Sequence, residues 1–259
     1  MGAMSLFKLD GKRALITGGS RGLGKEMALA LAEAGADIVI VGRDESILKN
    51  TAKEIGALGH EVGTIQADIS TPEEATKMAE KALSEYGRID ILINNVGGRR
   101  MDIPTEELPY DKWKWVLDLN LTSCFLCCKI IGKEMVKRKK GKVINTASIS
   151  GIISNKGIYG RSYETAKAAV MAFTKALAAD WAPYNINVNA IAPGYFLTDV
   201  NKRWFNEKPG YKESVNVQIP MGRPGDPKEI GPLAVYLASE ASSYMTGSVI
   251  VIDGGVTLW

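Results

Sequence analysis

The chain has 259 residues, 46% of them hydrophobic and 24% charged, and its 32 basic and 29 acidic residues leave a formal net charge of +3. This length suits one large α/β domain with a sizeable core, and the small net charge disfavours nucleic acid as a partner. We find no stretch that approaches the apolar length of a membrane span, and the N-terminus lacks the apolar core of a signal peptide, so we expect no membrane partner. Met1-Gly2-Ala3-Met4 could be an expression scar and is left out of the fold argument.

Short β-branched runs alternate with amphipathic helical stretches from one end of the chain to the other. We expect strands at Ala14–Thr17, Ile38–Val41, Glu61–Gln66, Ile89–Ile93, Val143–Thr146, Ile186–Ile191 and Val249–Ile252. We expect helices near Leu23–Ala34, Ser46–Leu58, Pro72–Tyr86, Tyr110–Arg138, Tyr163–Trp181 and Pro227–Ala238. This alternation predicts an α/β fold, a Rossmann-type doubly wound parallel sheet of about seven strands flanked by helices. Because no repeat or linker interrupts it, we expect a single domain over residues 1–259.

The turn between the first strand and the first helix is rich in glycine. It reads Thr17-Gly18-Gly19-Ser20-Arg21-Gly22-Leu23-Gly24. A loop of this kind brings backbone N–H groups and a helix N-terminus to a pyrophosphate, although glycine-rich turns also occur for geometric reasons alone. The predicted cofactor site therefore includes Gly18, Ser20, Arg21, Gly22, Leu23 and Gly24.

The end of the second strand bears on the choice of cofactor. An acid there would bind a ribose 2′-hydroxyl and indicate NAD, but Gly42 ends this strand and Arg43 follows it. Arg43 could pair with a 2′-phosphate, and Arg21 in the glycine loop could reach the same group. The pattern therefore favours NADP(H). Asp44 keeps NAD(H) open, because an acid just after Arg43 could contact the ribose instead.

Two further strand ends belong to the predicted cofactor site. Asp68 ends the third strand and could contact the adenine, and Ile69 follows it. Asn95 and Gly97 lie in the run Asn94-Asn95-Val96-Gly97 that ends the fourth strand. We expect this run where the strand order reverses and a crevice opens.

Tyr163 and Lys167 are spaced so that they share one face of an expected helix. A tyrosine hydroxyl has a reference pKa of about 10, and a nearby ammonium favours the phenolate and lowers that pKa. A phenol beside an ammonium, together with a nucleotide cradle, indicates hydride chemistry at a carbonyl or a carbinol. Such pairs also occur on solvated helices, so the coincidence with the glycine loop carries the argument.

Taken in order, the motifs resemble the short-chain dehydrogenase/reductase superfamily, and the resemblance covers almost the whole chain. The glycine loop matches T-G-x-x-x-G-x-G, and Asn94–Gly97 matches N-N-A-G with Val96 in place of alanine. Tyr163 and Lys167 make Y-x-x-x-K. Further matches are Pro193-Gly194 with Thr198, which follow P-G-x-x-x-T, and the C-terminal Asp253-Gly254-Gly255.

The resemblance implies four catalytic residues, Asn120, Ser148, Tyr163 and Lys167, and adds Pro193, Gly194 and Thr198 to the cofactor site. Tyr163 would exchange a proton with the substrate oxygen, while Lys167 would lower the pKa of Tyr163 and hold the nicotinamide ribose. Ser148 would hydrogen-bond the substrate oxygen, and Asn120 would position a water that links Lys167 to solvent. The family's usual spacing would select Ser150; we choose Ser148 because it holds the family's position after Ile144-Asn145.

The substrate is less closely defined. The run Ile191-Ala192-Pro193-Gly194-Tyr195 resembles sugar-acid and polyol members such as gluconate 5-dehydrogenase, and Arg99 and Arg100 could bind a carboxylate or form a solvated pair. We rank a sugar acid or polyol first and a 3-oxoacyl-carrier-protein substrate second; steroid and small-ketone reductases share the framework. A non-catalytic NADP(H)-binding regulatory module ranks far below.

Other segments carry weaker expectations. Cys124, Cys127 and Cys128 fit a reducing, cytoplasmic compartment, as small core residues rather than a metal site. The long insertion Thr198–Pro220 could form a lid or a plain surface excursion. The resemblance implies a homotetramer paired through the long fourth and fifth helices and the last strand, although their apolar faces suit packing on the sheet equally well.

Overall fold

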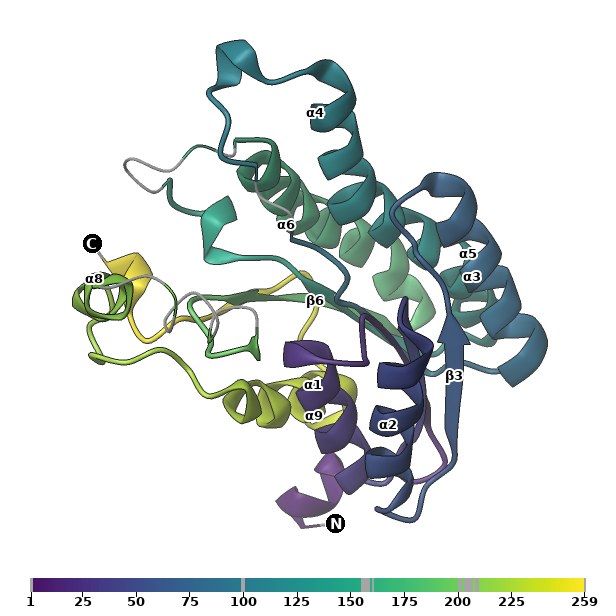
Figure 1. Ribbon diagram of the computed structural model, residues 1–259. Coiled ribbons are helices and arrows are strands. Elements are labelled where there is room, and N and C mark those ends of the chain that lie inside the picture. The colour runs from purple at the N-terminus through teal and green to yellow at the C-terminus, as the bar shows by residue number, and fades with distance from the viewer. Residues whose placement is uncertain are drawn as a thin grey trace.

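The computed structural model describes residues 2–98, 101–154, 159, 161–199, 202, 207 and 210–258. Its centre is a seven-stranded sheet in the order β3-β2-β1-β4-β5-β6-β7, with every neighbouring pair parallel (Figure 1). The strands are β1 Arg13–Thr17, β2 Asp37–Gly42, β3 Val62–Gln66, β4 Ile91–Asn94, β5 Gly141–Thr146, β6 Ile186–Pro193 and β7 Val249–Ile252. The predicted fold class is confirmed, and each predicted strand is present with its ends shifted by two residues or fewer.

The α-helices are α1 Gly22–Glu33, α2 Glu45–Gly56, α3 Pro72–Tyr86, α4 Tyr110–Leu117, α5 Ser123–Arg138, α6 Arg161–Trp181, α8 Tyr211–Val217 and α9 Gly231–Ala238. The expected helix Tyr110–Arg138 is divided into α4 and α5 by a π-helical turn over Asp118–Thr122. The expected helix Pro227–Ala238 begins as a 3-10 turn, Pro227–Ile230, before α9. The insertion Thr198–Pro220 contains α8, which the sequence did not predict. Part of that insertion lies outside the described residues, so its role as a lid stays a prediction.

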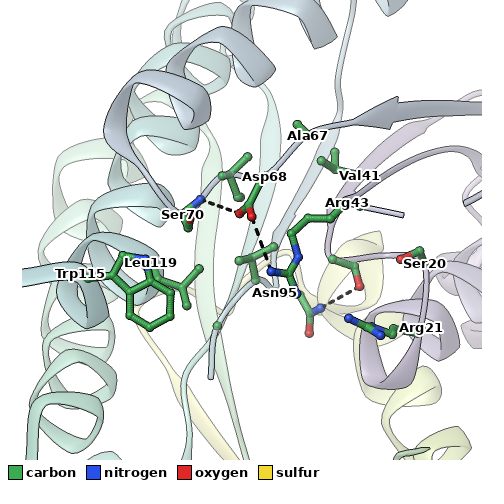
Figure 2. A pocket seen from close by; sticks show the side chains of 15 residues that line it. Ser20, Arg21, Val41, Arg43, Ala67, Asp68, Ser70, Asn95, Trp115 and Leu119 are labelled. Atoms are coloured by element: carbon green, nitrogen blue, oxygen red, sulfur yellow. Dashed lines mark hydrogen bonds and ion pairs between the residues drawn. The ribbon is translucent and has the colours of Figure 1, made fainter. Parts of the chain in front are cut away.

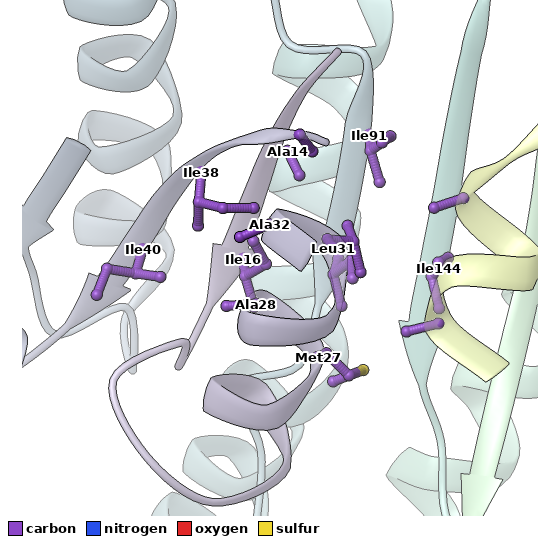
Figure 3. Close-up of a cluster of buried hydrophobic side chains, with 14 of the residues drawn as sticks. Ala14, Ile16, Met27, Ala28, Leu31, Ala32, Ile38, Ile40, Ile91 and Ile144 are labelled. Atoms are coloured by element: carbon purple, nitrogen blue, oxygen red, sulfur yellow. The ribbon is translucent and has the colours of Figure 1, made fainter. Parts of the chain in front are cut away.

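The five inner strands are buried on both faces, whereas the edge strands β3 and β7 are only partly buried; alternate residues serve the two faces. Ile38 and Ile40 of β2 pack into one apolar cluster with α1, α2 and α9 (Figure 3). Val39 and Val41 of the same strand pack into the other cluster, with α3, α5 and α6. Because side chains alternate along a strand, a continuous apolar run supplies both layers of a doubly wound sheet.

One expectation is contradicted by the apolar run that contains α4 and α5. By length and composition the run Tyr110–Arg138 could cross a membrane, with a mean hydropathy of 1.4 over an 18-residue window, so the statement that no stretch approaches such a length is wrong. Half of that window is buried inside the protein, and a core helix passes the same test. Cys124, Cys127 and Cys128 are among its buried residues, and burial raises the pKa of the Cys127 thiol well above its usual range. The cysteines are core residues, as expected.

Candidate active site

The glycine turn is tied to the point where the strand order reverses, between β1 and β4. The backbone N–H of Asn95 donates to the Thr17 hydroxyl at 2.9 Å. The Asn95 side-chain amide donates to the carbonyls of Thr17 and Gly18 at 3.1 and 3.3 Å. Gly18 has φ +65°, a left-handed conformation that favours glycine. These bonds fix the turn at the carboxyl edge of the sheet, where ligands bind in folds of this class.

The start of α1 differs from the starts of the two helices that follow. Asp44 caps α2 by accepting from the N–H of Ile47, and Thr71 caps α3 by accepting from the N–H of Glu74. Both of those helices also carry acids in the first turn. Among the described residues, α1 has no side-chain cap at Arg21 and no acid in its first turn. Its first N–H groups and its positive dipole end are therefore open to an anionic ligand.

Gly24 has a packing role. A Cβ there would lie 2.3 Å from the Gly18 carbonyl oxygen and 2.5 Å from Nδ2 of Asn95, so no larger residue fits. Among the described residues that line cavities at this edge, Gly24 is absent while Gly18, Gly22 and Leu23 are present. The glycine turn and the start of α1 together form the anion cradle. The structure places Gly24 behind this cradle, where the lack of a side chain lets α1 pack against Gly18 and Asn95.

A cavity of ≈ 220 Å³ opens beside the cradle at the ends of β1, β2 and β3. Half of the predicted cofactor residues line it, namely Gly18, Ser20, Arg21, Arg43, Asp68, Ile69, Asn95 and Gly97. Arg43 and Arg21 both point into it, and Arg43 Nη1 lies 3.5 Å from Asp68 Oδ2 (Figure 2). Trp115 and Leu119 also line it. Sequence reasoning missed these two, although their i, i+4 spacing before Asn120 is a signal that they share a helix face.

Asp44 does not compete with Arg43 for this cavity. Its carboxylate accepts from Ser46 Oγ at 2.6 Å and from the Ile47 N–H at 3.1 Å. These hydrogen bonds, that of Ser46 first, lower the pKa of Asp44. Among the described cavity-lining residues Arg43 appears and Asp44 does not. The acid that left NAD(H) open is thus engaged as a helix cap.

A larger cavity of ≈ 570 Å³ adjoins the first one and shares Arg21, Arg43, Asn95 and Gly97 with it. Its other walls include the predicted residues Leu23, Ser148, Tyr163, Lys167, Pro193, Gly194 and Thr198. Ser148 lines it, whereas Ser150 is not among the described lining residues. The Ser150 N–H donates to Ser148 Oγ at 3.1 Å. This geometry supports the choice of Ser148.

Lys167 is buried in the wall of this cavity, with 2% of its surface exposed. Its ammonium donates to the Thr146 carbonyl at 2.8 Å and lies 5.8 Å from the centre of the Tyr163 ring. Burial lowers the pKa of Lys167 from 10.5 to about 8. The α6 spacing therefore brings an ammonium and a phenol together at one surface, and the proton on the ammonium is held less tightly than on an exposed lysine.

Asn120 lies in the π-helical turn between α4 and α5 and is buried. Its Oδ1 accepts from the Gly98 N–H at 2.8 Å, and its Nδ2 donates to the carbonyls of Gly98 and Val116. A Cβ on Gly97 would lie 2.6 Å from Lys167 Nζ and 2.7 Å from Asn120 Oδ1. Lys167 and Asn120 thus converge on Gly97. Asn120 is not among the described cavity-lining residues, so the water relay stays a prediction.

One expectation cannot be placed. Arg99 and Arg100 lie outside the described residues, and their binding of a carboxylate stays a prediction.

The described part of the chain has no group of three or more His, Cys, Asp or Glu side chains that could hold a metal ion. The described residues bring a phenol, an ammonium and a hydroxyl together beside the open start of α1.

Comparison of the sequence with known protein families assigns the chain to a family. A family model described as enoyl-(acyl carrier protein) reductase matches residues 18–257. The chain belongs to the short-chain dehydrogenase/reductase family. The resemblance seen in the motifs is thereby confirmed, and membership makes this protein an oxidoreductase acting on CH–OH groups.

This chain is similar to relatives that are named for different substrates. A 2-dehydro-3-deoxy-D-gluconate 5-dehydrogenase of Dickeya dadantii (strain 3937) is 41% identical over 253 residues, 97% of this chain and 98% of the relative. A 3-oxoacyl-[acyl-carrier-protein] reductase of Synechocystis sp. is 36% identical over 253 residues, 97% and 99% of the two chains. The crystal structure of a gluconate 5-dehydrogenase from Burkholderia cenocepacia J2315, in complex with NADP and tartrate, superposes with a TM-score of 0.91 at 34% identity and covers 100% of both chains.

Proposed function

We propose that this protein is an NADP(H)-dependent dehydrogenase/reductase that interconverts a secondary alcohol and a ketone, with a sugar acid or a polyol as substrate. One observation carries the proposal. A single cavity is lined by Ser148, Tyr163 and Lys167, and it adjoins the open start of α1. No other described cavity combines a phenol, an ammonium and a hydroxyl with a nucleotide cradle.

The residues present fit a nicotinamide dinucleotide phosphate. The uncapped first turn of α1 offers N–H donors for a pyrophosphate, and Gly22 in that turn has φ +56°, a conformation that favours glycine. Arg21 and Arg43 share a cavity where a 2′-phosphate would be recognised, and Asp44 is engaged elsewhere. The gluconate 5-dehydrogenase that superposes on this chain binds NADP. NAD(H) is the second cofactor in this proposal.

When bound, the nicotinamide would supply or accept the hydride. Tyr163 donates a proton to the substrate oxygen during reduction and takes it back during oxidation. The ammonium of Lys167, held by the Thr146 carbonyl, stabilises the phenolate form of Tyr163 and would hold the nicotinamide ribose. Ser148 donates a hydrogen bond to the substrate oxygen as charge develops on it. Asn120, beside Lys167 at Gly97, positions a water that passes protons to Lys167.

The substrate class rests on similarity. The 2-dehydro-3-deoxy-D-gluconate 5-dehydrogenase and the gluconate 5-dehydrogenase both act on sugar acids, as their names state. The 3-oxoacyl-[acyl-carrier-protein] reductase relative supports the second candidate, reduction of a 3-oxoacyl thioester. A regulatory module without turnover ranks last, because residues suited to each catalytic role are present.

We further propose that the protein is a cytoplasmic homotetramer. Phe125 of α5 is 44% exposed and meets Phe173 of α6 edge-on, with ring centres 6.1 Å apart. Phe173 is partly buried. An exposed apolar ring supported by a neighbouring ring on the two long helices supports an interface there. Light scattering should give four times the chain mass; a monomer would refute this part of the proposal.

The test of function follows nicotinamide absorbance with purified protein. NADP⁺ and NAD⁺ are offered separately with a panel of sugar acids and polyols, and a 3-oxoacyl thioester is offered with NADPH. Oxidation of a sugar acid or polyol, with NADP⁺ preferred, is the expected result. Thioester reduction alone would select the second candidate. Cofactor binding without turnover on any compound would select the regulatory module.

A further inference from the structure

The amino edge of the sheet, opposite the crevice, surrounds a third and smaller cavity. Its walls come from the residue before β1, the starts of β4 and β5, β6, and the turn after α9. Three lysines line it, Lys12, Lys140 and Lys142, together with two acids, Asp90 and Glu240. The cavity volume is ≈ 30 Å³, against the roughly 10–15 Å³ that one water needs. It therefore has room for a small ion and none for a nucleotide.

Lys142 is the most buried of the three, with 8% of its surface exposed. Its ammonium donates to Asn187 Oδ1 at 2.8 Å. The Asn187 amide is itself oriented by its bonds to the carbonyls of Ser243 and Met245 at 3.0 and 3.1 Å. An ammonium has three protons to donate, and in the described part of the chain Asn187 is the acceptor that Lys142 reaches. The remaining protons are left for a group in the cavity.

The three lysines also act on one another. The pKa of Lys142 is lowered to about 8, mainly by burial; the charge of Glu240 opposes this shift, and the charges of Lys140 and Lys12 add to it. Burial, followed by the charge of Lys140, lowers the pKa of Lys12. Positive charge is thus concentrated at a site that disfavours it. An anion in the cavity would reverse this effect.

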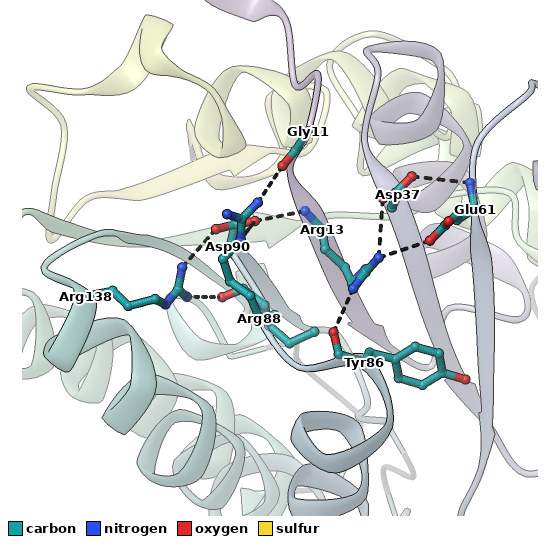
Figure 4. A network of polar contacts seen from close by, with 9 residues as sticks. Gly11, Arg13, Asp37, Glu61, Tyr86, Arg88, Asp90 and Arg138 are labelled. Atoms are coloured by element: carbon teal, nitrogen blue, oxygen red, sulfur yellow. Dashed lines mark hydrogen bonds and ion pairs between the residues drawn. The ribbon is translucent and has the colours of Figure 1, made fainter.

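The nearby acids are largely occupied. The Asp90 carboxylate accepts from the Arg13 N–H at 3.1 Å, from Arg88 Nε at 3.1 Å and from Arg138 Nη1 at 3.0 Å (Figure 4). Glu240 Oε1 lies 3.6 Å from Lys140 Nζ, and both side chains are about half exposed. Three ammonium groups therefore share a single carboxylate that is not already held by arginines.

We propose that this cavity binds a small, multiply charged oxyanion, such as inorganic phosphate or sulfate, through Lys12, Lys140 and Lys142. The anion supplies the missing counter-charge and accepts the free protons of Lys142. The site lies at the sheet edge opposite the crevice and is independent of the proposed function. Its expected consequence is stabilisation of the folded chain, because a ligand that binds only the folded state raises the unfolding temperature.

The test compares thermal unfolding of the full chain in inorganic phosphate and in chloride at equal ionic strength. Because the start of α1 could also take phosphate, the decisive comparison is between variants. Lys142→Met removes the central ammonium and keeps the side-chain length. Lys133→Met, an exposed lysine of α5, is the matched control.

Wild type and Lys133→Met should gain about 3–6 °C with phosphate at roughly ten times its Kd. Lys142→Met should lose that gain and should unfold at a higher temperature than wild type in chloride. An equal phosphate gain in Lys142→Met and wild type would overturn the proposal, as would no gain in wild type. Should Lys142→Met fail to fold, Lys12→Gln replaces it and should weaken phosphate binding about tenfold by isothermal titration. An equal response to sulfate would assign the site to tetrahedral oxyanions in general; a response to phosphate alone would make it phosphate-specific.

Discussion

The two edges of the sheet each hold a buried lysine whose pKa burial lowers to about 8, yet the surroundings of the two lysines differ. Lys167 at the carboxyl edge lines a cavity of ≈ 570 Å³ together with a tyrosine and a serine. Lys142 at the amino edge lines a cavity of ≈ 30 Å³ together with two other lysines. A lowered pKa therefore does not identify a catalytic lysine. The neighbouring groups identify it. An ammonium beside a phenol can stabilise the phenolate that a proton transfer produces, whereas an ammonium beside other ammonium groups favours a bound anion.

The largest difference between the two edges should appear in turnover. Lys167→Met removes the charge that stabilises the Tyr163 phenolate and should lower kcat/KM about 10²–10⁴-fold in the nicotinamide absorbance assay. Lys133→Met, which exchanges an exposed lysine of α5, should keep the wild-type value. Comparable losses of kcat/KM in the two variants would contradict a special role of Lys167 in turnover.

Cofactor choice should depend on the carboxyl edge alone. Arg43→Ser removes a charged partner of the 2′-phosphate and should lower the NADP⁺ to NAD⁺ ratio of kcat/KM about 10–100-fold. Arg88→Ser exchanges an arginine bonded to Asp90 at the amino edge and should leave that ratio as it is. An unchanged ratio in Arg43→Ser would transfer phosphate recognition to Arg21.

Stability should respond at both edges, with a smaller effect. Each lysine has a folded pKa of about 8 against 10.5, so between these values the unfolded chain binds more protons and wild-type stability rises with pH. Lys167→Met and Lys142→Met should each raise the free energy of unfolding by about 1–3 kcal/mol at pH 7 in chloride. Urea titrations at several pH values measure this gain, which should shrink as the pH rises from about 8 to 10.5. A gain that stays constant over that range would mean that it does not come from removing the buried charge.

Much of the fold could be predicted because its signals are local. Continuous apolar runs such as Ile38–Val41 report strands buried on both faces, and cap residues such as Thr71 report helix starts. The candidate site was predictable for a related reason: the carboxyl ends of parallel strands meet at one edge, so motifs that follow strands gather there. Ser148 and Lys167 line one cavity although 18 other residues separate them in the sequence.

Features that depend on packing could not be predicted from the sequence. The π-helical turn at Asp118–Thr122 has the same apolar spacing as a continuous helix, so periodicity could not reveal it. The lysine cavity joins Lys12 to Lys142, and their proximity depends on the order in which β1, β4 and β5 lie in the sheet. Trp115, which lines the cavity beside the glycine turn, belongs to α4, the helix that this π-helical turn follows.

The most direct test of the account is turnover by Tyr163→Phe, with Tyr244→Phe, a fully exposed tyrosine near the amino edge, as the matched control. Both variants should fold and bind NADPH with wild-type affinity, as measured by nicotinamide fluorescence. Tyr163→Phe should lose about 10²–10⁴-fold in kcat because the proton donor to the substrate oxygen is gone, and Tyr244→Phe should lose nothing. Near-normal turnover by folded, cofactor-binding Tyr163→Phe would contradict the assignment of the chemistry to the cavity at the carboxyl edge.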